Sequence, residues 1–284
     1  MLDCRDHLVT GERFEIATCD GCGLGMTEPQ PDLEVIGRYY ESADYLPMTN
    51  VGRGPVARVY RAVRRVTVRL RLGIVARSAP RVGGRLLDVG CGTGEFLAHA
   101  RGAGWRVVGV EPSARAAEQA ARHGIPVRRT TDLELHDELP FDAITMWHAL
   151  EHMHEPGIQL ERAARLLAPG GCLVVAVPNH DCVDAEAYAA DWYAWDVPRH
   201  LWHFTPATLG QLLARHGFAV EGLHALPFDP FYIALLSELR GRRKHNVVRA
   251  AVVAVRSAIA ARRDPARASA IVVVARRADG AGMP

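Results

Sequence analysis

Residues 86–97 read Leu86-Leu-Asp-Val-Gly-Cys-Gly-Thr-Gly-Glu-Phe-Leu97, a short apolar run followed by three alternating glycines and the start of a helical pattern. This order predicts a strand, a tight turn and a helix. Gly90, Gly92 and Gly94 permit backbone conformations that a side chain would forbid, and they let the backbone approach a ligand closely. Above the strand ends of a parallel sheet, such a turn is a ligand site.

On both sides of this turn, short apolar runs alternate with helical stretches, which is typical of βαβ units and a parallel sheet. The expected strands span residues 85–89, 106–110, 126–129, 141–147, 171–178, 217–225 and 268–276. We therefore predict a doubly wound, mostly parallel α/β domain over residues 81–278. A helical insertion at 229–263 separates its last two strands.

Two shorter regions precede this domain. Residues 1–30 carry three cysteines and several glycines, and they predict a small loop-rich knuckle. Residues 31–80 place apolar side chains at helical spacing, so we expect helices there.

The bulk properties exclude some partners. The chain has 284 residues with 34 Lys and Arg against 32 Asp and Glu. This near balance of charge gives no indication that the chain binds nucleic acid. No signal-peptide pattern and no long uncharged apolar run is present, and the six cysteines do not suggest a disulfide framework. We therefore expect a cytoplasmic protein with metal-ligating or buried thiols.

Two features narrow the ligand of the glycine turn. A dinucleotide site usually spaces its glycines as G-x-G-x-x-G, whereas the spacing here is G-x-G-x-G. Asp88 stands before the turn, where its charge would repel phosphates but suits a ligand with a cationic amino group. Glu111 ends the next expected strand and can accept hydrogen bonds from both hydroxyls of a ribose.

At this point the sequence resembles the class I S-adenosylmethionine-dependent methyltransferases over residues 84–225. The resemblance rests on six motifs in order: D-x-G-x-G-x-G at 88–94, Glu111, Thr131-Asp-Leu133, Phe141-Asp-Ala-Ile-Thr-Met-Trp-His-Ala-Leu-Glu-His152, Leu167-Ala-Pro-Gly-Gly171 and Pro178-Asn179. The chain is most similar to the subgroup that contains ubiquinone-pathway O-methyltransferases. This resemblance implies a seven-stranded, Rossmann-like methyltransferase sheet.

The resemblance also implies roles for individual residues. Asp88 and the turn hold the methionine portion of S-adenosylmethionine, Glu111 holds the ribose, and Asp132 with Leu133 contacts the adenine. Trp147 and His148 line the wall beside the sulfonium. The full implied cofactor set is Asp88, Gly90, Cys91, Gly92, Gly94, Glu111, Pro112, Asp132, Leu133, Trp147 and His148. As an alternative, Asp132 is a helix N-cap.

Several histidines are candidates for the base that would take a proton from a hydroxyl acceptor. They are His148, His152, His200 and His203. Residues 148–152 also spell H-x-x-E-H, a zinc-protease pattern, but no third ligand is evident. We expect His148 and His152 one helical turn apart on one face.

The connection at residues 191–206 is unusually rich in aromatic and polar side chains. It is either a substrate lid or a satellite core built on Trp192, Trp195 and Trp202. Arg199 pairs with an acidic substrate group or with Asp196.

The N-terminal cysteines offer a metal site. Cys4, His7, Cys19 and Cys22 form a Cys₃His set with two-residue spacings, which tetrahedral zinc accepts. The alternative is a degenerate knuckle without metal. Relatives that resemble this segment carry a second C-x-x-C where His7 stands here.

The basic, apolar insertion at 229–263 either contacts an anionic membrane surface or forms a helical hairpin with a solvated face. The leading hypothesis is an enzyme that methylates an oxygen of a small-molecule or glycan-type acceptor, with carbon and nitrogen acceptors as alternatives. A second hypothesis is a non-catalytic scaffold that binds the same cofactor. A third, a nicotinamide dehydrogenase, is opposed by the glycine spacing.

Overall fold

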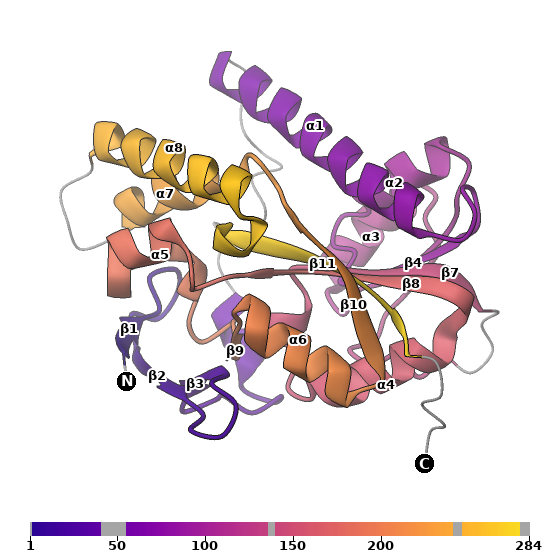
Figure 1. Cartoon of the computed structure of the whole chain (residues 1–284), viewed down its shortest axis with the longest axis horizontal. Coiled ribbons are helices and arrows are strands. Elements are labelled where there is room, and N and C mark those ends of the chain that lie inside the picture. Colours follow the sequence, from indigo (N-terminus) through magenta and orange to yellow (C-terminus); the bar gives the residue numbers. More distant parts are fainter. Residues whose placement is uncertain (1, 41–54, 136–139, 241–245, 279–284) are drawn as a thin grey trace.

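The computed structural model describes residues 2–40, 55–135, 140–240 and 246–278. Its centre is a seven-stranded sheet in the order β10-β11-β8-β7-β4-β5-β6 (Figure 1). The strands are β4 (Arg85–Val89), β5 (Arg106–Val110), β6 (Val127–Arg128), β7 (Phe141–Trp147), β8 (Leu167–Pro178), β10 (Phe218–Ala225) and β11 (Ala270–Arg277).

The direction of these strands confirms the predicted doubly wound topology. The pairs β4–β5, β4–β7, β5–β6 and β7–β8 are parallel, whereas β11 is antiparallel to both β8 and β10. The parallel strands therefore end together at one edge of the sheet, and the glycine turn follows β4 at that edge.

Helices cover both faces of the sheet (Figure 1). On one face lie α1 (Pro55–Ser78), α2 (Glu95–Gly102) and α3 (Ala114–Arg122), and on the other lie α4 (Pro156–Leu166) and α6 (Pro206–Arg215). Each face has its own apolar core, represented by Val75 and Leu97 on the first side and Leu160 and Leu209 on the second. All seven residues of β7 are buried, as expected for a central strand covered on both faces.

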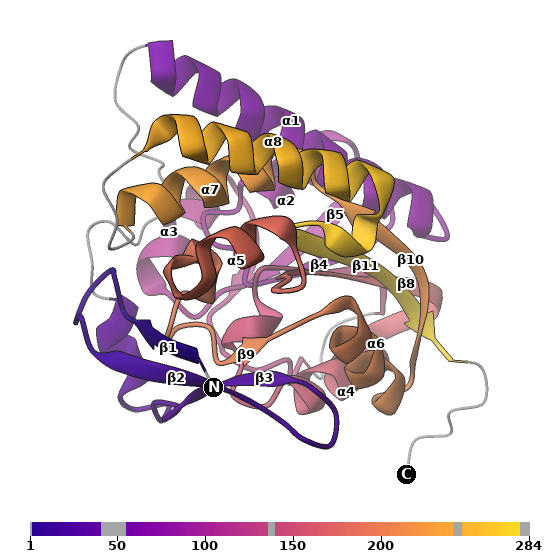
Figure 2. The ribbon, with the colours of Figure 1, turned by 60° about the vertical axis from the view of Figure 1, so that its left-hand side comes forward.

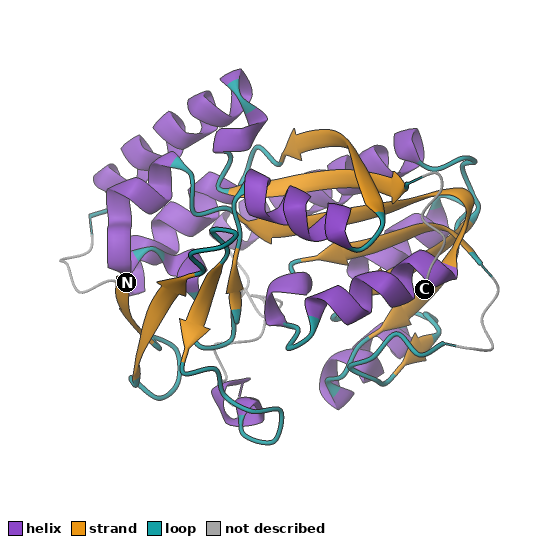
Figure 3. Ribbon diagram, turned by 60° about the horizontal axis from the view of Figure 1, so that its bottom comes forward, coloured by secondary structure: helices purple, strands orange, loops and turns teal. Residues whose placement is uncertain are grey.

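The N-terminal segment forms strands rather than the loop-rich knuckle that the sequence predicted. A second sheet has the order β1-β2-β3-β9 (Figure 3), with β1 (Leu2–Arg5), β2 (Arg13–Thr18), β3 (Gly25–Glu28) and β9 (Trp202–His203). In β2, buried Phe14 and Ile16 alternate with exposed residues, which is the pattern of a half-buried strand. Because β9 comes from the connection after β8, this sheet ties the N-terminus to the main domain.

The connection after β8 builds a satellite core. It contains α5 (Val183–Tyr188) and the 3₁₀ turns η3 (Ala189–Asp191) and η4 (Tyr193–Trp195). Trp192 and Trp195 are buried there with Cys4, Phe14 and Tyr39, and Tyr39 belongs to the 3₁₀ helix η1 (Ile36–Tyr40). Trp192 and Trp195 are therefore core residues, as one of the two sequence interpretations expected, whereas Trp202 packs against the core of the main sheet instead.

The predicted helical insertion is confirmed. In the sequence, the helices α7 (Asp229–Arg240) and α8 (Val247–Arg263) and the turn η5 (Pro265–Arg267) come between β10 and β11. The two helices lie side by side (Figure 2). Ser257 of α8 donates a 2.7 Å hydrogen bond to buried Asp184 of α5, which anchors the insertion. In the described part of the chain, no helix is long and apolar enough to cross a membrane.

Candidate cofactor site

The glycine turn between β4 and α2 leaves an open space at its middle. Gly90, Gly92 and Gly94 have φ angles of 72°, 53° and 76°, a region that strains other residues. A Cβ on Gly90 would lie 2.9 Å from Ala149 Cβ, and one on Gly94 would lie 2.7 Å from Ala120 Cβ. Among the described residues, nothing lies within 4 Å of a Cβ placed on Gly92. Two glycines thus permit close packing, and the third leaves room for a ligand.

Asp88 is the acid beneath this turn. It is buried, and Thr145 Oγ1 donates a 2.7 Å hydrogen bond to its Oδ1. Burial raises the pKa of Asp88 to about 7, while the Thr145 hydrogen bond and the charge of Arg71 oppose that rise and Glu111 adds to it. A cationic ligand would favour the ionised form of this carboxyl group.

Glu111 lies at the end of β5 and holds the turn in place. Its Oε2 accepts a 2.9 Å hydrogen bond from the Gly92 amide, and its Oε1 accepts one of 2.9 Å from the Ser113 amide. Burial raises its pKa, and these two amides counteract that effect. Each carboxylate oxygen has two lone pairs, so Glu111 retains capacity for a ligand hydroxyl.

Cys91 and Pro112, the two other predicted cofactor contacts beside these acids, differ in exposure. The Cys91 side chain is buried, and a Cβ on Gly109 would lie 2.5 Å from its Sγ, which shows how closely the thiol packs on β5. Burial raises the Cys91 pKa far above its usual range, so the thiol is inert as a nucleophile. Pro112 is exposed immediately after Glu111.

Trp147 ends β7 and His148 follows it, next to the glycine turn. The Trp147 ring packs edge-on against Phe96, and its Nε1 is buried without a hydrogen-bond partner among the described residues. His148 has a φ of 54°, which is strained for a residue other than glycine. Its Nδ1 lies 3.3 Å from Glu151 Oε1, and its side chain is 33% exposed.

Arg71 is a residue of this site that the sequence analysis missed. Its guanidinium carbon lies 4.9 Å from the centre of the Trp147 ring, and its Nε is buried without a hydrogen-bond partner among the described residues. The charges of Asp229 and Asp88 act on it. Arg71 lies on the same face of α1 as buried Val68 and Val75. An arginine within this apolar face is the sequence feature from which Arg71 could have been predicted as a site residue.

The comparisons with known proteins agree with this arrangement. Residues 58–223, more than half of the chain, match the model of a family described as a methyltransferase domain. The chain belongs to this family. The predicted family resemblance is confirmed.

A curated relative of this methyltransferase domain is a ubiquinone biosynthesis O-methyltransferase from Rhodopseudomonas palustris (strain HaA2). It is 34% identical over 163 residues, which span 51% of this chain and 62% of the relative. The match therefore spans less than two thirds of that relative's length.

Two solved structures show the same fold. A SAM-dependent methyltransferase from Thermotoga maritima, a possible histamine N-methyltransferase, superposes with a TM-score of 0.52 at 22% identity over 78% of this chain and 95% of that chain. The [4+2]-cyclase SpnF superposes with a TM-score of 0.50 at 21% identity over 76% of this chain and 82% of that chain. The Rossmann-like methyltransferase fold is thus confirmed.

Asp132 and Leu133 both form contacts with other residues of the methyltransferase domain. Asp132 pairs with Arg162, and its own amide donates to Thr130 Oγ1 at 3.0 Å. The Leu133 side chain is buried in the core, and its amide donates to Gln159 Oε1 at 3.1 Å. No described helix begins at Asp132, so the N-cap alternative is wrong. The adenine contact stays a prediction.

The four candidate histidines do not share one environment. His148 and His152 were expected one helical turn apart, but the only helix here is the short 3₁₀ helix η2 (Leu150–His152). His200 and His203 are buried. Burial lowers the pKa of His200 to about 4 and holds that of His203 well below its usual value, and His203 Nε2 lies 2.8 Å from Thr27 Oγ1. His203 is therefore structural, and the base assignment for it is wrong.

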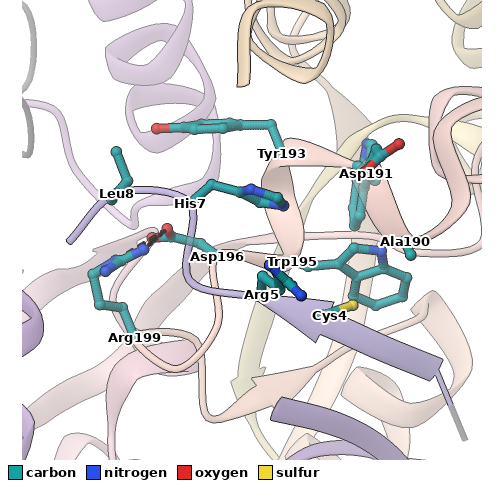
Figure 4. Close-up of a pocket in the computed structure, with 11 residues that line it drawn as sticks. Cys4, Arg5, His7, Leu8, Ala190, Asp191, Tyr193, Trp195, Asp196 and Arg199 are labelled. Atoms are coloured by element: carbon teal, nitrogen blue, oxygen red, sulfur yellow. Dashed lines mark hydrogen bonds and ion pairs between the residues drawn. The ribbon is translucent and has the colours of Figure 1, made fainter. Parts of the chain in front are cut away.

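The four candidate zinc ligands are not brought together. Cys4 pairs with Phe14 across the β1–β2 hairpin, and Cys19 follows five residues later, roughly 15 Å away along an extended strand. Figure 4 shows Cys4 and His7 in the wall of a small pocket beside Trp195 and Arg199. Cys19 and Cys22 lie in the turn between β2 and β3, at the other end of β2. The prediction of a four-ligand zinc site is therefore wrong, because the strand register places the two ligand pairs at opposite ends of β2.

Arg199 locks the N-terminal sheet to the satellite core. It is 1% exposed, and its Nη2 lies 3.0 Å from Asp6 Oδ1 and 2.6 Å from Asp196 Oδ1. Its Nη1 donates to the Tyr39 carbonyl at 2.9 Å. The Asp196 pairing predicted as one alternative is confirmed, and Figure 4 shows this contact.

Proposed function

We propose that the chain is a cytoplasmic S-adenosylmethionine-dependent methyltransferase that acts on an oxygen of a small-molecule or glycan-type acceptor. The observation that carries the proposal is the open space beside Gly92, flanked by the buried acids Asp88 and Glu111. The oxygen acceptor is supported by the name of the R. palustris relative. Six free cysteines support a reducing compartment.

The proposed cofactor contacts follow from charge. The carboxylate of Asp88 pairs with the amino group of the methionine portion, and Arg71 pairs with its carboxylate. Glu111 accepts hydrogen bonds from the ribose hydroxyls with the lone pairs that the Gly92 and Ser113 amides leave. Asp132 and Leu133 remain the proposed boundary of the adenine pocket.

When bound, S-adenosylmethionine supplies a methyl group already activated on a positively charged sulfur. The residues of the chain then need to align the acceptor with that group and to exclude water. The acceptor hydroxyl also loses a proton as its oxygen is methylated. His148 is the proposed recipient, because its ring is partly exposed at the strand end and its Nδ1 lies against Glu151.

A turnover assay tests this proposal. Incubating the protein with S-adenosylmethionine and a panel of phenols, catechols, sugars and amines is expected to release S-adenosylhomocysteine with the hydroxyl compounds. Binding of S-adenosylmethionine without product from the panel or from a metabolite extract would instead favour a cofactor-binding scaffold. The SpnF structure supports considering this alternative, because a protein named as a [4+2]-cyclase shares the fold.

Arg71→Met is expected to weaken S-adenosylmethionine binding by about 10- to 100-fold, because a hydrogen-bonded charge contributes about 1.5–3 kcal/mol. Calorimetry with decarboxylated S-adenosylmethionine is the matched measurement, and its affinity should be the same in the variant and the wild type. Arg69→Met, at an exposed position of the same helix, is the control. Equal losses for both ligands would refute the carboxylate assignment.

The pKa of Asp88 predicts a pH dependence of binding. In the free protein this pKa is about 7, and a cationic ligand stabilises the ionised form. Binding near neutrality therefore releases a proton, and affinity rises as the pH rises through 7. Between about pH 6 and 7.5, where the ligand's α-amino group is still mainly protonated, calorimetry should show an increase of about five- to sixfold. An affinity that falls over this range would contradict the pairing.

A further inference from the structure

A compact cluster of potential metal ligands lies next to the cofactor site. Glu151, His152 and His200 each place one ligand atom within 4.8 Å of the others. Glu151 and His152 belong to η2, directly after β7, whereas His200 comes from the connection that builds the satellite core. Chain segments almost fifty residues apart therefore converge on one point.

Glu151 lacks a partner at one of its oxygens. The residue is fully buried, and among the described residues no group donates a hydrogen bond to its Oε2. Its other oxygen, Oε1, lies 3.3 Å from His148 Nδ1. A buried carboxylate oxygen without a partner is costly, so this atom calls for a cation or a donor that the protein itself does not supply.

The hydrogen bonds of the two histidines prepare their other nitrogens for a ligand. His152 Nδ1 lies 2.9 Å from the Arg199 carbonyl, and His200 Nδ1 lies 2.9 Å from the Ala194 carbonyl. A carbonyl oxygen can only accept, so each Nδ1 carries a proton, which leaves Nε2 as the nitrogen that the neutral imidazole would offer to a metal ion. Metal-binding histidines are oriented by the same kind of backbone contact.

The residues of the cluster offer a donor set that suits a metal ion. The His152 and His200 rings lie 4.7 Å apart, centre to centre. A further acid, Asp196, places its Oδ2 3.8 Å from His200 Nε2, while its Oδ1 accepts a hydrogen bond from Arg199. Two imidazoles and one carboxylate form the nitrogen and oxygen donor set that zinc accepts, with a fourth position left for water or substrate.

We propose that Glu151, His152 and His200 bind one divalent transition-metal ion of the zinc type. The site lies close to Glu111, the acid proposed to hold the ribose, since the charge of His152 acts on the Glu111 carboxyl group. A metal ion there would lower the pKa of an acceptor hydroxyl bound to it. This catalytic role rests on the proposed function, whereas metal binding does not.

Cobalt(II) is a suitable probe, because its visible absorption reports the ligand type. Full-length protein stripped with EDTA is titrated with CoCl₂ and then back-titrated with ZnCl₂. We expect one ion per chain with a nitrogen and oxygen ligand spectrum. Glu151→Gln and His200→Gln should each weaken binding at least about 10-fold, since even indirect ligand partners contribute 10- to 100-fold. His123→Gln, at an exposed helix end, should bind as the wild type does.

Two controls keep the result interpretable. His152→Gln changes a half-buried position and provides a second test if Glu151→Gln does not fold, as judged by circular dichroism. Cys19→Ser separates this site from thiolate binding in the β2–β3 turn. No saturable binding, binding unchanged in the folded glutamine variants, or a thiolate band lost in Cys19→Ser would each overturn the proposal. S-adenosylmethionine affinity, measured in the same samples, reports on the proposed function separately.

Discussion

Asp88→Asn is expected to weaken S-adenosylmethionine binding by at least about 100-fold in calorimetric titration. The variant leaves the ligand's ammonium group in a buried site without its anionic partner, and truncating one member of such a pair costs about 2–5 kcal/mol. Asparagine has nearly the same shape, and its amide oxygen can still accept the hydrogen bond from Thr145. The effect should therefore lie in binding and not in folding.

The matched control is Asp20→Asn, which removes an acid from the exposed turn between β2 and β3. This control should bind the cofactor as the wild type does. Thermal unfolding of Asp88→Asn should occur at or above the wild-type temperature, because burial raises the pKa of this carboxyl group and so opposes its charge. Undiminished affinity in a folded Asp88→Asn protein would count against the assignment.

Arg199→Met is expected to lower the free energy of unfolding by about 3–5 kcal/mol, because it leaves Asp6 and Asp196 as buried charges without their cation. The loss should be measured by urea denaturation. The urea concentration at the midpoint of unfolding should fall. The N-terminal sheet should separate from the satellite core, since Arg199 links them directly.

Arg13→Met is the comparison for Arg199→Met. Arg13 and Asp3 are both more than half exposed and lie 3.8 Å apart, so this change should cost less than about 1 kcal/mol. Adding Asp196→Asn to Arg199→Met should recover part of the lost stability. A loss below about 1 kcal/mol in Arg199→Met would show that the buried cluster does not hold the two parts together.

The main sheet could be predicted because its strands carry a strong local signal. Residues 85–89, 106–110 and 141–147 were predicted with the bounds that the structure has, since these strands are buried on both faces and are almost continuously apolar. The glycine turn was equally visible, because its three glycines and the preceding acid are adjacent in the chain.

The N-terminal region was harder to predict because its ligand pattern and its strand pairing conflict. The spacing of Cys4, His7, Cys19 and Cys22 suits zinc, but only the register of β1 against β2 shows that the pairs lie at opposite ends of a strand. Likewise, H-x-x-E-H implies a helix, and nothing local indicates that His148 would adopt a positive φ.

Long-range contacts account for the remaining differences. Arg71 reaches the site from a helix that ends before the first strand of the sheet, and His200 meets Glu151 from the far end of a connection. Neither contact follows from spacing within a motif. Periodicity identifies which face of an element is buried, but it does not identify which distant residue meets that face.

The open space beside Gly92 is expected to receive S-adenosylmethionine. Calorimetric titration of the purified protein with S-adenosylmethionine, S-adenosylhomocysteine and NAD tests it most directly. We expect saturable 1:1 binding of both sulfur nucleosides and no binding of NAD. Binding of NAD with no uptake of either sulfur nucleoside would contradict it.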